Sequence, residues 1–173
     1  NSLKYQVSWP GFDPMYLQNE TEVDARVSYY GVSGVPYSVL NGAAVSGSSY
    51  LGAPVNITQA HLNSAGASAA SVEVDVVWDW ANTQLNAIDI TVTIANTNGG
   101  VDFSGADRLQ VVVFEKEINF AVAPGTNGEK DFYMVMRDML PDENGTTIGT
   151  IASGTPQVFT FTNQPVPSNL YDL

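Results

Sequence analysis

The sequence contains no cysteine, which excludes disulfide bonds, a thiolate nucleophile and an iron–sulfur centre. It contains a single histidine, His61, and no metal-binding residue type lies three or four positions after it. A Ser-His-Asp triad or a histidine-based metal site is therefore not indicated. We expect His61 to have a packing or helix-surface role, and we expect the protein not to be an enzyme.

Basic residues are scarce, with 6 Lys and Arg against 18 Asp and Glu and a formal net charge of −12. Nucleic-acid affinity comes from neutralising phosphates with Lys and Arg, so this balance argues against a nucleic-acid partner. Anionic membrane surfaces are disfavoured for the same reason. No apolar run approaches the roughly 18–20 residues of a spanning helix, so the chain is not expected to cross a membrane. The low-charge, Ser-, Thr- and Asn-rich composition favours an extracellular or bacterial cell-surface location.

Residues 1–66 have the pattern of a mixed α/β segment. Leu3, Tyr5, Val7 and Trp9 alternate with polar residues, which predicts a strand. The elements expected after it are a helix over 20–30, a strand over 35–40 closed by an Asn-Gly turn at 41–42, and a helix over 57–64 capped by Asn56. Small residues at 66–71 predict a linker, and we place a domain boundary there.

Residues 71–173 have the pattern of an antiparallel β-sandwich, because only strands and turns are expected. Strands are predicted over 72–80, 88–94, 109–114, 132–140 and 157–162. The segment 109–114 is apolar on both faces, which predicts a central strand covered on both sides. Phe159 and Phe161 are expected to point inward. The fold class predicted for the whole chain is mainly β, and α+β overall.

The order of elements in the first segment resembles the second half of a thioredoxin fold. Val35-Pro36-Tyr37 lies where that fold carries a cis-proline, so the resemblance implies that Pro36 is structural and possesses a cis bond. Further motifs resemble the outer membrane protein 28-related surface proteins of Bacteroidetes-type bacteria. They are Trp9-Pro10-Gly11, Asp13-Pro14-Met15-Tyr16, the run from Tyr30 to Pro36, Leu40-Asn41-Gly42, the run from Met136 to Pro141, Asn144-Gly145-Thr146 and Phe159-Thr160-Phe161.

This resemblance implies a partial thioredoxin-like α/β segment over 1–66, followed by a β-sandwich domain over 71–173. It also implies that the sandwich lacks a strand that the family usually has after the position of Leu173. An open row of backbone groups beside a core is costly unless a partner strand fills it. Two candidate donor strands are expected, the segment Leu3–Trp9 and the C-terminal tail Phe159–Leu173, in which Pro165 and Pro167 favour an extended chain. The tail's candidate assembly residues are Val166, Leu170, Tyr171 and Leu173.

Trp78 and Trp80 could stack on sugars, but they share the parity of the apolar residues of 72–80, which predicts core packing. Asp75 and Asp79 fall on the opposite face and are about 13 Å apart in a strand, too far for a glycosidase pair. The loop 138–144 offers carboxylate and amide oxygens of the kind calcium prefers, although an ordinary acidic turn is the expected reading. No other cofactor is indicated.

The pattern Asn-X-Ser/Thr makes Asn19, Asn56 and Asn144 possible glycosylation sites, although such matches are usually idle in bacteria. The function expected first is a non-enzymatic structural protein, a subunit that forms a homo-oligomer or a helical filament with itself by β-strand complementation. The alternative is a surface module that binds glycans or peptides through the loops 102–107 or 125–130. A third hypothesis is a chaperone-like peptide binder near Pro36.

Overall fold

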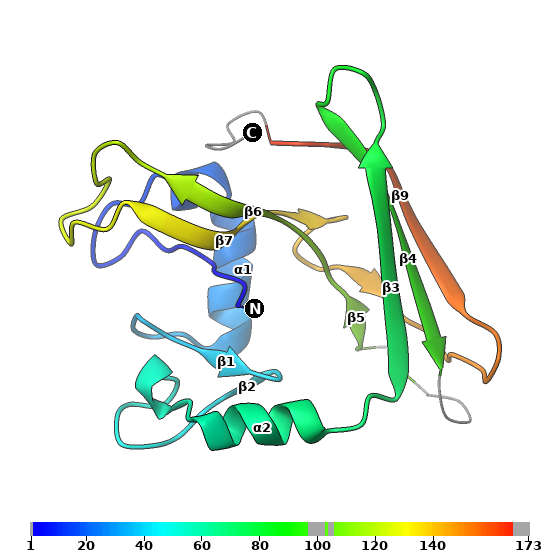
Figure 1. Cartoon of the computed structure of the whole chain (residues 1–173), viewed down its shortest axis with the longest axis horizontal. Helices are drawn as coiled ribbons and strands as arrows, with labels where there is room; N and C mark the ends of the chain where they lie inside the picture. The colour runs from blue at the N-terminus through cyan, green and yellow to red at the C-terminus, as the bar shows by residue number, and fades with distance from the viewer. Residues whose placement is uncertain (1, 97–102, 104–105, 168–173) are drawn as a thin grey trace. The chain divides into compact units, whose positions relative to one another are not determined.

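The computed structural model describes residues 2–96, 103 and 106–167. It divides the chain into two compact units, Asn1–Arg26 with Ser71–Leu173, and Val27–Ala70. The division falls inside the first helix, α1, which spans Glu20–Tyr30. The predicted mainly β, α+β fold is confirmed: the described residues contain antiparallel sheets and two α-helices, as Figure 1 shows.

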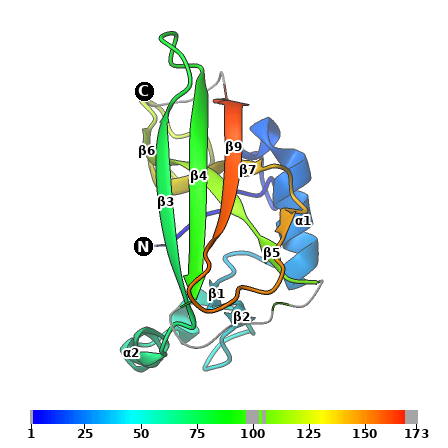
Figure 2. The ribbon, with the colours of Figure 1, turned by 90° about the vertical axis from the view of Figure 1, so that its right-hand side faces the viewer.

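The larger unit contains a three-stranded antiparallel sheet in the order β3-β4-β9 (Figures 1 and 2). Its strands are β3 Val72–Trp80, β4 Ala87–Asn96 and β9 Gln157–Pro165. These are three of the strands that the alternating pattern predicted. β4 lies in the middle and β3 at one edge, so β4 alone has a strand on both sides.

Two strand pairs in the same unit supply the facing layer. The longer pair joins β6 Val111–Asn119 to β7 Asp131–Leu140, and the shorter pair joins β5 Arg108–Leu109 to β8 Thr146–Thr147. Core side chains of β4 pack with Leu140 of β7 and with Phe161 of β9, and Val111 and Val113 of β6 lie against the same cluster. The core that joins the two layers therefore lies between β4 with Phe161 of β9 on one side and Leu140, Ile148 and Ile151 on the other.

A second apolar cluster holds the start of the chain to the β6-β7 hairpin. It consists of Met15, Ile118, Phe132 and Val135, all buried. The 3-10 turn Tyr16–Gln18 leads from Met15 into α1. Its start is fixed by Asp13, whose carboxylate accepts hydrogen bonds from the backbone N–H groups of Met15 and Tyr16, at 2.8 and 3.1 Å.

The predicted strand over Leu3–Trp9 is wrong as an element of this chain's own sheets. Only Lys4 forms a β-bridge, parallel to Val135 of β7. Its N–H donates to the carbonyl of Met134 and its carbonyl accepts from Met136, both at 2.8 Å. The alternation of the segment is real, but a strand requires a neighbouring strand along its length, and this one has a single bridge.

The interpretation of 109–114 as a central, doubly covered strand is also wrong. These residues belong to β5 and to the first half of β6, and among the described residues β6 pairs with β7 alone. Phe114 is 43% exposed. An apolar pattern on both faces shows that burial is favourable, but it does not show that this chain provides the cover.

The smaller unit consists of a short hairpin, a 3-10 turn and the helix α2. The hairpin pairs β1 Val39–Leu40 with β2 Ala43–Ala44, and both residues of its Asn41-Gly42 turn have positive φ. The predicted strand over 35–40 is thus shorter than expected, because Pro36 has no N–H to donate. The 3-10 turn Pro54–Asn56 follows.

Helix α2 spans Gln59–Ala67 and is capped by Thr58, not by Asn56 as predicted. The backbone N–H of His61 donates to the Thr58 hydroxyl, and the His61 ring lies 3.2 Å from the Thr58 N–H. Asn56 is used elsewhere: its buried amide accepts from the N–H of Ser49 and donates to the carbonyls of Val45 and Tyr50. The thioredoxin-like character of this region stays a prediction.

Candidate functional site

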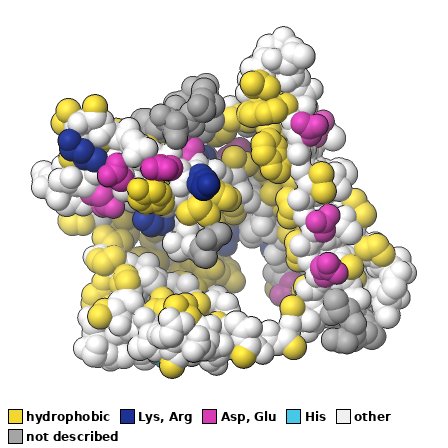
Figure 3. All heavy atoms as spheres, viewed as in Figure 1, with side chains coloured by type: hydrophobic (Ala, Val, Ile, Leu, Met, Phe, Trp, Pro, Cys, Tyr) yellow, Lys and Arg dark blue, Asp and Glu magenta, His cyan; other side chains and the backbone are white. Residues whose placement is uncertain are grey.

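The inner face of β3 is apolar and uncovered. Val74, Val76 and Trp78 are 53%, 53% and 58% exposed. Each is paired in register with a residue of β4 that is almost fully buried, namely Ile94, Val92 and Ile90. Paired residues of an antiparallel ladder lie on the same face of the sheet. The face that forms the core at β4 therefore continues onto β3 without cover, and Figure 3 shows hydrophobic side chains exposed along this strand.

The edge of β6 lies opposite this face. Between them is a groove of about 630 Å³. The lining from the first sheet is Val76, Trp78, Trp80, Ile88, Ile90 and Val166, and the lining from β6 is Val111, Val112, Val113, Phe114, Glu115, Lys116 and Glu117. Consecutive residues of β6 all reach the groove, as expected when a strand presents its edge to a groove and side chains of both faces border it.

The groove is apolar with charge at one end. Trp78 and Trp80 contact each other edge to face, with ring centroids 5.9 Å apart. The charged lining residues are Glu115, Lys116 and Glu117, of which Glu115 is buried and ion-paired to Arg137 at 3.2 Å. An elongated apolar surface beside a strand edge is chemically suited to an extended peptide, whose backbone can pair with the edge while alternate side chains fill the groove.

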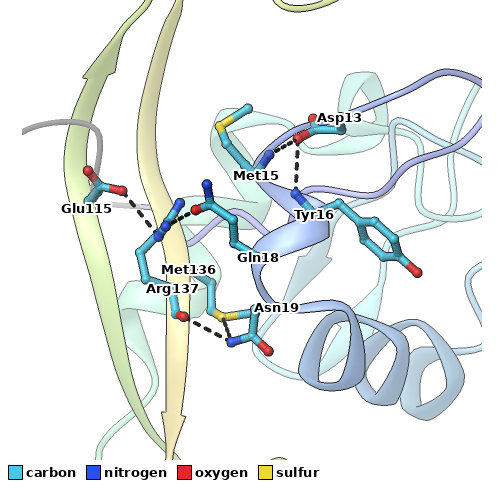
Figure 4. A network of polar contacts seen from close by, with 8 residues as sticks. All are labelled: Asp13, Met15, Tyr16, Gln18, Asn19, Glu115, Met136 and Arg137. Atoms are coloured by element: carbon cyan, nitrogen blue, oxygen red, sulfur yellow. Dashed lines mark hydrogen bonds and ion pairs between the residues drawn. The ribbon is translucent and has the colours of Figure 1, made fainter. Parts of the chain in front are cut away.

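The ion pair of Glu115 and Arg137 belongs to a buried polar network between β6, β7 and the start of α1 (Figure 4). Arg137 also donates to the side-chain carbonyl of Gln18. Asn19 donates to the backbone carbonyl of Arg137 at 3.0 Å and contacts the sulfur of Met136. These contacts connect the 3-10 turn before α1 to β7, behind the apolar groove.

A carboxylate pair extends this network. Glu22 in the first turn of α1 is buried and accepts a hydrogen bond from Asn19. The pKa of Glu22 is raised to about 7, mainly by burial and also by the charge of the neighbouring Asp138, against the lowering effect of the hydrogen bond from Asn19. Burial also raises the pKa of Asp138, while hydrogen bonds from the backbone of Met139 and from Glu22 lower it. Glu22 therefore changes its charge near neutral pH, beside a second carboxyl group.

The expectation that Trp78 and Trp80 pack in the core is wrong, since they are 58% and 37% exposed. Their parity does place them on the core face, but the opposite layer does not extend over β3. Asp75 and Asp79 are exposed, as predicted, on the other side of the strand. The described residues contain no group of three His, Cys, Asp or Glu placed to hold a metal ion. In the acidic loop, Asp142 instead accepts from the backbone N–H of Asn144 at 2.8 Å.

The candidate donor residues lie in different surroundings. Tyr5, Val7 and Trp9 are half-buried and Leu3 is 39% exposed. Val166 lines the groove, and its N–H donates to the carbonyl of Asn86 at 2.9 Å. The other tail candidates, Leu170, Tyr171 and Leu173, lie outside the described residues.

The remaining sequence candidates are dispersed. The Val35–Pro36 bond is cis. Of the possible glycosylation sites, Asn144 is exposed, Asn19 is half-buried in the polar network, and Asn56 is buried with its amide fully used. The loop 125–130 is described, whereas half of the loop 102–107, residues 102, 104 and 105, lies outside the described residues.

Sequence reasoning missed the polar network, although one signal was present. An arginine within the apolar run 132–140 has to find an acidic partner when the strand is buried, because an unpaired buried charge is very costly. The partner Glu115 and the pair of Glu22 with Asp138 could not be found this way, since they are joined only by folding. No helix of the described residues combines the length and apolar character needed to cross a membrane.

Comparison of the chain with protein-family models, with curated proteins and with solved structures gave no match. The resemblance to the outer membrane protein 28-related proteins therefore stays a prediction from the sequence motifs.

Proposed function

We propose that this protein is a non-enzymatic structural subunit of an extracellular or cell-surface assembly, in which each copy accepts a β-strand from a neighbour. One observation carries the proposal: the core face of β3 is exposed directly opposite the edge of β6. A strand added to that edge would pair with backbone groups of β6 and would cover β3 with the same residues.

One added strand would bury apolar side chains of β3 and of the segment 111–114 of β6 at the same time. Full burial of a side chain the size of valine or phenylalanine contributes about 1.5–3 kcal/mol, so each half-exposed residue along β3 would contribute about 1 kcal/mol when covered. The segment 111–114 gains as well, because its apolar pattern on both faces matches a central strand and β6 would become one. Large apolar patches of this kind on soluble proteins commonly mark interaction sites.

The second face of β3 favours controlled assembly. Glu73, Asp75 and Asp79 alternate with the apolar residues and are exposed. Charges along an edge strand discourage unspecific edge-to-edge pairing. These acidic residues lie on the outer face of β3 and leave its inner face free to bind a partner. β3 would therefore resist unspecific aggregation through its outer face while the groove beside its inner face accepts a strand.

A second candidate function is glycan binding, favoured by the exposed indoles of Trp78 and Trp80 in the groove. Aromatic faces stack on the apolar faces of sugars, and only one or two rings are needed. In this case the protein would be a surface binding module that stays monomeric, and the groove would hold an oligosaccharide in place of a strand.

A pair of substitutions on adjacent residues of β3 tests the first candidate. Val76→Asp places a charge in the groove, whereas Val77→Asp places it on the opposite face at a residue that is 60% exposed. We expect light scattering and negative-stain microscopy to detect concentration-dependent polymers for wild type and Val77→Asp but not for Val76→Asp. Monomeric wild type at all concentrations would refute the assembly. Glycan-array binding that is lost in Trp78→Ala would then support the second candidate.

A further inference from the structure

We infer that the strand accepted by the groove is the segment Leu3–Trp9 of a second copy of this chain. The inference rests on the proposed function and adds the identity of the donor. Two segments have a sequence pattern that differs from the structure they adopt. Residues 3–9 have the pattern of a strand but form a single bridge, at Lys4. Residues 111–114 have the pattern of a covered central strand but lie at a strand edge beside the groove. Each segment requires the kind of neighbour that the other would provide.

The lengths of the two surfaces agree. The β6 side of the groove is lined from Val111 to Glu117, and the apolar positions of the donor run from Leu3 to Trp9. Each spans six residue steps, about 20 Å in an extended strand. The donor presents an apolar side chain at every second position, so its side chains would face the three residues of β3 that line the groove, Val76, Trp78 and Trp80. The polar alternate positions of the donor would then face solvent.

The segment is able to reach a neighbour. Asp13 fixes the chain just before the 3-10 turn, through its two hydrogen bonds to backbone N–H groups. The ten residues from Leu3 to Phe12 precede this anchor and span about 33 Å when extended. Exchange from the present position breaks the Lys4 bridge with its two backbone hydrogen bonds, together with the contact that Tyr5 makes. Pairing along β6 would form more than two in return.

Charge favours this donor over the C-terminal tail. The chain carries a net charge of −12, so association of two copies is opposed by repulsion. The segment 3–9 contains Lys4 and no acidic residue, so its own charge does not add to this repulsion. The tail carries Asp172 instead. It also contains Pro165 and Pro167, which have no N–H to donate to a neighbouring strand.

The experiment uses full-length variants mixed in pairs. Val7→Asp damages the donor and leaves the groove intact, while Val76→Asp damages the groove and leaves the donor intact. We expect neither variant to form polymers alone, with the concentration for half-maximal assembly raised by about tenfold or more, since burial of a charge is costly. Mixed together, they should form a 1:1 heterodimer and nothing larger. Sedimentation velocity measures the mass, and the heterodimer itself demonstrates that both variants are folded.

Two further variants act as controls. Gln6→Asp changes the polar face of the donor next to Val7, and it should assemble as wild type does. Leu170→Asp in the tail should also assemble normally. Loss of assembly in Leu170→Asp together with normal assembly of Val7→Asp would overturn the inference and leave the proposed function standing, because the donor would be the tail. Normal assembly of Val76→Asp would overturn both, because the groove would not be the acceptor.

Discussion

Replacement of Glu22 by Gln should stabilise the protein at pH 8 and remove much of its pH dependence. Glu22 is buried, lies beside Asp138 and has a pKa raised to about 7. A glutamine amide has the same shape as the protonated carboxyl group. Its oxygen can accept the hydrogen bond from Asn19, and its NH₂ group can donate to Asp138, so the variant mimics the protonated state at every pH.

The direction follows from proton linkage. The unfolded chain releases the Glu22 proton near the ordinary pKa of 4.5, whereas the folded chain retains it up to about pH 7. Between these values the unfolded state binds fewer protons, so the free energy of unfolding falls as the pH rises. The stabilising contribution of the protonated group is thus complete below pH 4.5 and lost by the time the pH exceeds about 7.

One pKa unit corresponds to roughly 1.4 kcal/mol. A rise in the pKa of Glu22 from 4.5 to about 7 on folding therefore changes the free energy of unfolding by about 3 kcal/mol between low and high pH. The end of a helix is partly screened by solvent, so we expect about 2 kcal/mol. The assay is urea unfolding followed by tryptophan fluorescence at pH 5, 6, 7 and 8. The free energy of unfolding of Glu22→Gln should exceed that of wild type by about 2 kcal/mol at pH 8, and this difference should shrink steadily toward pH 5.

Glu20→Gln is the matched control, because Glu20 lies in the same helical turn and is exposed. It should change the free energy of unfolding by less than about 0.5 kcal/mol at every pH. Equal effects of the two substitutions at pH 8, or a Glu22→Gln effect that does not vary between pH 5 and 8, would refute the reasoning.

Three more predictions concern the polar network and the smaller unit. Arg137→Met should lower the free energy of unfolding in urea by about 3–5 kcal/mol, because Glu115 is left buried without its ion pair, and Arg137→Met combined with Glu115→Leu should recover most of that loss. Asn56→Ala removes three hydrogen bonds and should increase amide hydrogen exchange in residues 45–56; unchanged exchange would show that the loop is held by other contacts. Gly52→Ala should lower the midpoint of thermal unfolding more than Gly42→Ala, since both glycines have φ of +82° but only at residue 52 would the added Cβ meet an aromatic ring, at 2.4 Å.

Several elements of the fold depend on local pattern alone and were predicted from the residues that form them. Helix α1 has the predicted bounds because its acidic first turn and its terminating glycine at 31 act locally. The strands β3, β4 and β9 were predicted because alternation of apolar residues defines the face of a strand that burial favours. Phe161 is buried and Phe159 packs against the same core, as their positions in β9 required.

Which of these faces is covered depends on contacts between distant parts of the chain. Trp78 has the parity of a core residue and is 58% exposed, and 111–114 has the pattern of a central strand and lies at an edge. Alternation of apolar and polar residues indicates which face of a strand is favourable to bury. Whether that face is buried depends on where the other strands lie. The carboxylate pair of Glu22 and Asp138 depends on folding in the same way, because no local pattern relates a helix start to the end of a distant strand. The groove and the buried charges of this protein are therefore properties of contacts between elements, which the spacing of residues along the chain does not specify.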